Sequence, residues 1–163
     1  MSANTRPATN ATTIIARPGT PFLEMVRDFD APPSRVWRAW ADPELVVRWL
    51  GPSRNKMRID TWDVRPGGSY RYVHITPDGA EQVFRGVYHQ VIENQLTIET
   101  FEWEGAPNQV SVGTTTYEDL GGRTRLTTRS VFPSVEALEL AMATGMEGGM
   151  RESMDRLDAL LTP

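Results

Sequence analysis

The sequence predicts an α+β fold in which a curved antiparallel sheet wraps around a long C-terminal helix. Three observations lead to this prediction. Residues 56–132 alternate between apolar and polar side chains with a period of two, and short turns divide them into six segments. Two short helical segments precede this block. After it, apolar residues recur at spacings of three and four to residue 161, which indicates an amphipathic helix.

The elements before the alternating block are a strand and two short helices. Residues 22–29 alternate in part and predict the strand, which the Ala31-Pro32-Pro33 segment ends. Residues 34–41 carry a valine and two tryptophans at helical spacing and predict the first helix. Asp42-Pro43-Glu44 has the features of a second helix start: a capping aspartate, a proline at the first position and an acid in the first turn. Gly51-Pro52 ends this second helix.

Short turns such as Arg65–Gly68 and Pro77–Gly79 separate the six segments of the alternating block. Because parallel strands need long crossover connections, links this short predict an antiparallel meander. The strands are expected at Lys56–Val64, Ser69–Ile75, Gln82–Ile92, Leu96–Trp103, Gln109–Glu118 and Arg123–Phe132.

The final segment is expected to hold a short helix from Val135 to Met142 and then the amphipathic helix. Met146, Met150, Met154 and Leu157 share one face of that helix and are predicted to pack it against the sheet. Laying the helix across the inner face of the sheet is the economical way to bury both apolar surfaces.

Composition limits the protein class. The chain has 163 residues, 39% of them hydrophobic and 23% charged, which is typical of one soluble domain. We expect a disordered tail over residues 1–13 and one domain over residues 14–163. No apolar run approaches the ~20 residues that span a bilayer, and no secretory signal is evident, so we expect a cytoplasmic protein without a membrane span.

The same composition excludes several kinds of chemistry. The absence of cysteine rules out disulfides, thiolate metal sites and cysteine nucleophiles. Only two histidines, His74 and His89, are available, and the acidic residues are scattered, so no metal site is expected. A net charge of −4 argues against a nucleic-acid partner. No nucleotide-binding glycine loop or nucleophile elbow is present, and no cofactor is expected.

A series of short motifs, spread from Phe22 to Leu161, is similar to one family in order and spacing. The motifs are Phe29-Asp30-Ala31-Pro32, Val36-Trp37-Arg38-Ala39-Trp40, Asp42-Pro43-Glu44, Arg48-Trp49-Leu50-Gly51-Pro52, Arg65-Pro66-Gly67-Gly68, Phe84-Arg85-Gly86, Glu118-Asp119-Leu120-Gly121-Gly122, Thr124-Arg125-Leu126, Thr144-Gly145-Met146 and Asp155-Arg156-Leu157.

These motifs resemble the family related to the activator of the heat-shock protein 90 ATPase, within the START-like helix-grip (SRPBCC) superfamily. One departure is Leu50, where family members often carry a second aromatic residue. The resemblance implies a helix-grip fold with a cavity between the sheet and the C-terminal helix. It also implies binding of small apolar molecules there. Superfamily members elsewhere catalyse ring closures or hydrolyses, and the eukaryotic namesake contributes to chaperone activation.

The segment Ser69–Ile75 is the first candidate for a cavity wall. Alternation places Tyr70, Tyr72 and His74 on one face, and rings with polar tips suit an apolar ligand held by a few hydrogen bonds. The alternative is that these side chains belong to the packed core or to a solvent-exposed rim. The residues expected to contact a ligand are Trp40, Tyr70, Tyr72, His74, Phe84, Phe101, Trp103, Tyr117, Met146 and Met150.

Other residues allow two interpretations. Glu99 shares a face with Phe101 and Trp103, so it is either a buried acid, with Arg129 as its partner, or a solvated edge residue, which we favour. Gly86 and Gly113 leave room inside strands for a ligand, or, as we favour, for the helix or a bend in the sheet. Gly148-Gly149 either loosens the terminal helix as a gate or allows close packing.

The leading functional hypothesis is a module that binds a small hydrophobic or aromatic molecule. One alternative is a cyclase or hydrolase acting on a polyketide-like substrate, with His74 as the candidate general base and tyrosine hydroxyls assisting. The other is a co-chaperone-type protein that acts through its surface. A chaperone partner and a homodimer both remain open.

Overall fold

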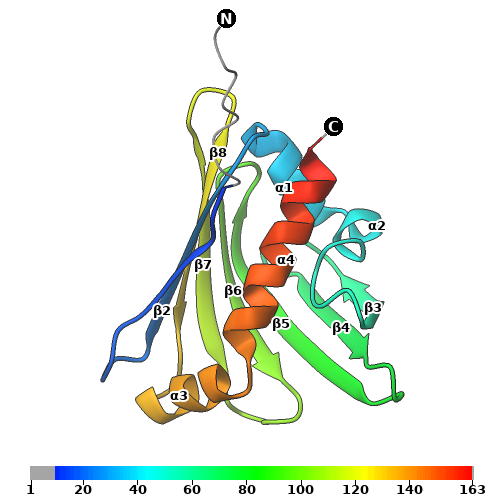
Figure 1. Ribbon diagram of the computed structural model, residues 1–163, viewed down its shortest axis with the longest axis vertical. Helices are drawn as coiled ribbons and strands as arrows, with labels where there is room; N and C mark the ends of the chain where they lie inside the picture. The colour runs from blue at the N-terminus through cyan, green and yellow to red at the C-terminus, as the bar shows by residue number, and fades with distance from the viewer. Residues whose placement is uncertain (1–9, 163) are drawn as a thin grey trace, which may run out of the picture.

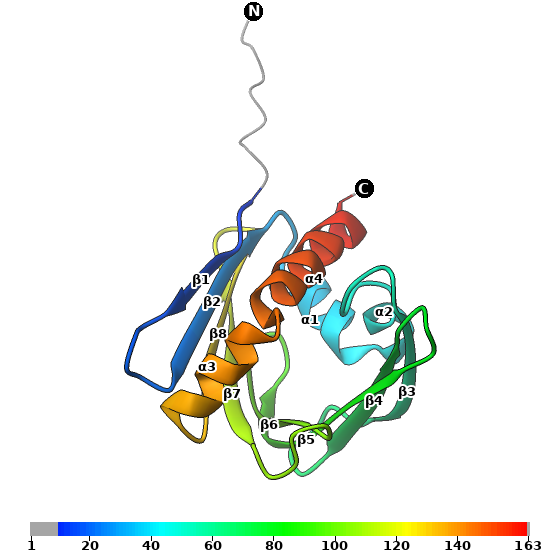
Figure 2. The ribbon, with the colours of Figure 1, turned by 60° about the horizontal axis from the view of Figure 1, so that its bottom comes forward.

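The computed structural model, which describes residues 10–162, confirms the predicted fold class: one curved sheet of eight antiparallel strands with a helix across its inner face (Figures 1 and 2). In chain order, the elements are β1 Thr13–Ala16, β2 Phe22–Phe29, α1 Pro33–Ala41, α2 Pro43–Val46, β3 Lys56–Trp62, β4 Ser69–Ile75, β5 Glu81–Ile92, β6 Leu96–Trp103, β7 Ser111–Asp119, β8 Thr124–Val131, α3 Val135–Ala143 and α4 Met146–Leu161.

The strand order is β1-β2-β8-β7-β6-β5-β4-β3. Strands β3 to β8 therefore form the predicted meander, and β2 closes it by pairing with β8. Figure 2 shows the sheet curving around α4, with α1 and α2 on the side of β3 and β4. Every pairing is antiparallel, as the short turns require.

One boundary differs from the sequence-based expectation. Residues 13–16 form β1 against β2, although a tail was expected through residue 13; residues 1–9 of that expected tail lie outside the described residues. The C-terminal segment consists of a short helix and the amphipathic helix, as expected, and they are separated at Gly145, whose φ of +85° is a left-handed conformation that favours glycine. Within residues 10–162, no helix combines the length and apolar character needed to cross a membrane.

The main core lies between α4, α1 and the inner face of β2 and β8. Phe29 of β2, Val36 of α1, Leu126 of β8 and Leu157 of α4 are fully buried in it. Of the methionines predicted to pack α4, Met154 is buried with Leu157, Met150 packs against the core while partly buried, and Met146 is half-buried.

A buried arginine anchors α4 to the sheet. Arg27 of β2 is only 2% exposed, and its guanidinium donates to Asp155 Oδ1 at 2.7 Å and to Asp158 Oδ2 at 3.1 Å on α4. It also donates to Thr12 Oγ1 at 2.9 Å. Since a buried guanidinium is costly without partners, these carboxylates fix α4 against β2.

The opposite edge of α4 is held by the loop after α2. The backbone N–H of Gly51 donates to Ser153 Oγ at 2.8 Å. Arg156 donates to the carbonyl oxygens of Gly51, at 2.5 Å, and Arg48, at 2.9 Å. The second half of α4 is therefore bonded to the rest of the protein along both of its edges.

The first turns of α4 contain Gly148-Gly149. A Cβ at either glycine would meet no heavy atom within 4 Å. The interpretation that these glycines allow close packing is therefore wrong. What remains is their effect on the helix, which each weakens by roughly 1 kcal/mol relative to alanine.

Removing the charges that hold Arg27 is expected to destabilise the fold. In the Asp155→Asn/Asp158→Asn variant the guanidinium stays buried without a charged partner, so urea unfolding should show a loss of about 3–5 kcal/mol. The matched control is Asp28→Asn, which removes the surface ion pair with Arg125 and should cost less than about 1 kcal/mol. Equal losses in the two variants would contradict the anchoring role.

Candidate functional site

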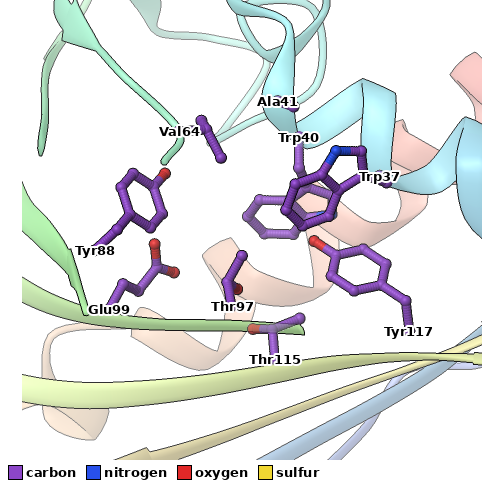
Figure 3. A pocket seen from close by; sticks show the side chains of 9 residues that line it. All are labelled: Trp37, Trp40, Ala41, Val64, Tyr88, Thr97, Glu99, Thr115 and Tyr117. Atoms are coloured by element: carbon purple, nitrogen blue, oxygen red, sulfur yellow. The ribbon is translucent and has the colours of Figure 1, made fainter. Parts of the chain in front are cut away.

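A small cavity lies between α1 and the inner face of the sheet. Its volume is about 20 Å³, which is room for about one water molecule. Its lining comes from α1, the segment after β3, and strands β5, β6 and β7, with aromatic rings and polar groups facing one another (Figure 3). The lining residues are Trp37, Trp40, Ala41, Val64, Tyr88, Thr97, Glu99, Thr115 and Tyr117.

Strand register places the polar groups of the cavity floor. Side chains directly opposite one another in paired strands lie on the same face of a sheet. One such row crosses four strands as Tyr88, Glu99, Gly113 and Ser130. The next row runs through Thr97, Thr115 and Thr128, and the hydroxyls of Thr115 and Thr128 are 3.0 Å apart. The floor is thus a band of hydroxyls with one carboxyl.

Glu99 is the one charged residue in the cavity lining. Burial raises its pKa to about 7, and a hydrogen bond with the Tyr88 hydroxyl partly offsets this effect. No ion pair among residues 10–162 involves Glu99, and Arg129 instead pairs with Glu24 at 2.8 Å. Both the favoured interpretation of Glu99 as a solvated edge residue and the pairing with Arg129 are wrong.

Two tryptophans of α1 form the cavity roof. The Trp37 ring meets the Tyr117 ring edge-on, with centroids 5.4 Å apart, and the Trp40 ring meets the Trp49 ring edge-on at 4.4 Å. The Nε1–H of Trp40 is buried and has no hydrogen-bond acceptor among the described residues. An unpaired buried donor costs about 1–3 kcal/mol, so an acceptor that enters the cavity would relieve a real penalty.

The floor remains open beside the cavity at Gly113. A Cβ there would make ordinary van der Waals contact with Ser130 Oγ at 3.9 Å and with the Glu99 carbonyl oxygen at 4.0 Å, and no atom of α4 lies within 4 Å of it. Of the two favoured explanations for Gly113, a close approach of the helix is therefore wrong, and a bend in the sheet stays a prediction. Thr128 and Ser130 along the same band are only half-buried. Solvent thus reaches the polar band near Glu99.

A cluster of stacked aromatic rings borders the cavity on the β4 side. Tyr72 stacks on Phe84, and Phe84 stacks on Phe101, with ring centroids 5.2 and 5.5 Å apart. The Tyr70 hydroxyl donates to the Thr100 carbonyl oxygen at 2.6 Å. These four aromatic residues pack against one another instead of lining the cavity, so their contact with a ligand remains a prediction.

Gly86 makes the Tyr70 interaction possible. A Cβ at this position would lie 2.5 Å from the Tyr70 hydroxyl oxygen and 1.9 Å from the Thr100 carbonyl oxygen. The room that the missing side chain leaves is therefore taken by a side chain of the neighbouring strand.

His74 also lies outside the cavity lining. Its ring is buried beneath Gly51 and meets the Tyr72 ring edge-on, with centroids 5.3 Å apart. Burial, reinforced by the Arg156 charge, lowers its pKa. Its Nδ1 has no hydrogen-bond partner among the described residues. His74 is thus packed against the Gly51 loop and absent from the cavity lining, and its catalytic role remains a prediction.

The other predicted site residues have different positions. Trp40 and Tyr117 line the cavity. Trp103 is 36% exposed, at the end of β6, beside Gly105. Met146 and Met150 lie on the weakly anchored half of α4. Among residues 10–162, no three histidine or acidic side chains gather in a way that could hold a metal ion.

Comparisons with known proteins agree on the fold. The family model described as Activator of Hsp90 ATPase homolog 1-like protein matches residues 30–162. A solution structure of a protein from Arthrobacter aurescens is 30% identical, with a TM-score of 0.84 over 91% of this chain and 90% of that chain. A crystal structure of a protein from Mycobacterium smegmatis is 29% identical, with a TM-score of 0.81 over 92% and 97%. Comparison with curated proteins gives no significant match.

Packing of His74 beneath Gly51 can be tested with alanine at two glycines. Gly51 and Gly121 have nearly the same φ, +84° and +85°, but only at Gly51 would a Cβ collide with His74, at 2.3 Å from Cε1. Gly51→Ala should therefore lower the free energy of unfolding by about 1–3 kcal/mol more than Gly121→Ala. In a His74→Ala background this excess should largely disappear. An excess that persists there would contradict the packing.

The raised pKa of Glu99 makes a prediction about stability against pH. The unfolded carboxyl titrates near its ordinary pKa of 4.5 and the folded one near 7. The cost of ionising Glu99 in the fold is therefore absent below pH 4.5 and complete above pH 7. From the difference between these pKa values, Glu99→Gln should raise the free energy of unfolding at pH 8 by about 3 kcal/mol and leave it nearly unchanged at pH 4.

Glu102 on the same strand is the control. Hydrogen bonds from the Asn108 backbone and Arg85 lower its pKa, so Glu102→Gln should destabilise the protein at pH 8. If both substitutions change the free energy of unfolding at pH 8 in the same direction, the assignment of Glu99 and Glu102 to opposite faces of β6 is contradicted.

Proposed function

The chain belongs to the Activator of Hsp90 ATPase homolog 1-like family and has the helix-grip fold of START-like ligand-binding domains, and from this premise we propose that it binds a small apolar or aromatic molecule at the cavity beneath α1. The observation that carries this proposal is the convergence of Trp37, Trp40, Tyr88 and Tyr117 on a space that also holds the Glu99 carboxyl. Ligand sites are commonly apolar hollows with a few polar groups that fix orientation.

The size of the cavity indicates that the described structure is a closed form. A volume of about 20 Å³ accepts a water molecule but no aromatic ring, so a ligand must displace lining side chains. The open band at Gly113 lies beside Glu99, and the first turns of α4 are weakened by two glycines. We infer that a ligand enters along this band and that the start of α4 yields to admit it.

Catalysis by His74 has less support. Its ring lies beneath Gly51, its pKa is lowered, and the Glu99 carboxyl belongs to a different part of the inner face. A general base must reach its proton within hydrogen-bond distance, and the Gly51 loop occupies the position over His74 that a substrate would need. Binding without turnover is therefore the better-supported function.

A cavity-filling variant tests the location of the ligand. The probe is p-xylene, a neutral aromatic molecule, titrated into labelled protein and followed by the NMR signals of the tryptophan indole N–H groups. In the unchanged protein we expect saturable shifts of the Trp37 and Trp40 signals. Ala41→Val places two methyl groups at the cavity and should weaken p-xylene binding at least about tenfold, since overpacking costs about 1–3 kcal/mol.

The matched control is Ala143→Val, which changes an exposed alanine in the last turn of α3 and should leave binding unchanged. The proposal is overturned by an absence of saturable shifts up to the solubility limit of p-xylene. It is equally overturned by equal binding to the Ala41 and Ala143 variants.

A further inference from the structure

We propose that the ligand carries a neutral hydroxyl group, which donates a hydrogen bond to the Glu99 carboxylate and accepts one from the Trp40 Nε1–H. This inference rests on the proposed function and specifies the chemistry of its ligand. The hydroxyl would mark the end of the ligand that enters deepest, with its apolar body along the band past Gly113.

The Glu99 carboxylate is the acceptor. Glu99 lies on the cavity floor, and the Tyr88 hydroxyl is the one hydrogen-bonding side chain among the described residues that lowers its pKa. A carboxylate has about four acceptor positions, so acceptor capacity remains after Tyr88 has donated. Ligand groups that donate a hydrogen bond are therefore favoured beside Glu99.

The Trp40 indole N–H is the donor. Trp40 lies in the roof, on the side of the cavity opposite the strand that carries Glu99 (Figure 3). Its Nε1–H is buried and lacks an acceptor among residues 10–162, whereas the corresponding groups of Trp49 and Trp62 donate to the carbonyl oxygens of Ala39 and Trp40. A ligand atom that accepts a hydrogen bond would satisfy the one fully buried indole N–H that lacks an acceptor among the described residues.

The cavity limits the size and charge of the ligand group. A hydroxyl is the smallest neutral organic group that both donates and accepts a hydrogen bond, and it fits a space for about one water molecule. An ammonium group donates but cannot accept from Trp40. A carboxylate or phosphate would lie beside Glu99 with no arginine, lysine or histidine in the cavity lining to offset the repulsion.

A matched pair of probes tests the inference. p-Cresol and p-xylene have nearly the same shape and differ in a hydroxyl against a methyl group. At pH 8, above the pKa of Glu99, the carboxyl is mostly ionised, and we expect p-cresol to bind about tenfold more tightly than p-xylene, as one net hydrogen bond of this kind provides. 4-Methylbenzoate should show no saturable binding in the same concentration range. Dissociation constants come from the same indole NMR signals, and from backbone amides of β6 where Trp40 is replaced.

Three variants assign the preference to its atoms. Glu99→Leu removes the acceptor and Trp40→Phe removes the donor, so each should lower the ratio of the two dissociation constants by the contribution of the one hydrogen bond that it removes. Glu99→Gln keeps a carbonyl acceptor of the same shape and should retain most of the preference. Thermal unfolding of each variant shows whether it is folded before binding is measured.

The outcomes separate the two proposals. If both probes bind with equal affinity, or if the preference for p-cresol is undiminished in Glu99→Leu, the hydroxyl inference is overturned while binding at the cavity stands. If neither probe binds to the unchanged protein, the proposed function itself is overturned. Tight binding of 4-methylbenzoate would overturn the assignment of a neutral group.

Discussion

The structure depends on how α4 is held across the inner face of the sheet. The helix is held by apolar packing on its buried face and by polar bonds at its edges. Arg27 supplies one edge through Asp155 and Asp158, and the Gly51 loop supplies the other through Ser153 and Arg156. With both edges fixed by directional polar bonds, apolar packing need not fill the whole interior, and a cavity can persist under α1.

Sequence periodicity predicted the fold well because the strands obey it. The six strands from Lys56 onward appear within one to two residues of their expected limits, since one face of each is buried and the turns between them are short. β1 was missed because four residues hold too little pattern.

The site was predicted only in part. Alternation correctly grouped Glu99 with Phe101, and one further step across the register would have placed it opposite Tyr88. The sequence could not show which inner-face residues pack against one another and which line the cavity. Tyr70 follows the alternation expected of a cavity wall, but its hydroxyl lies against Gly86 and donates to the Thr100 carbonyl oxygen. That distinction is set by three-dimensional packing among several strands.

The uneven anchoring of α4 has a consequence for kinetics. Its second half is bonded to β2 and to the Gly51 loop, whereas a Cβ at Gly148 or Gly149 in the first half would meet no heavy atom within 4 Å. Fraying of these first turns breaks none of the bonds to Arg27 and none of the strand pairing. Exchange between the interior and bulk water can then proceed by local fluctuation, at a rate set by two glycines and independent of the global unfolding barrier.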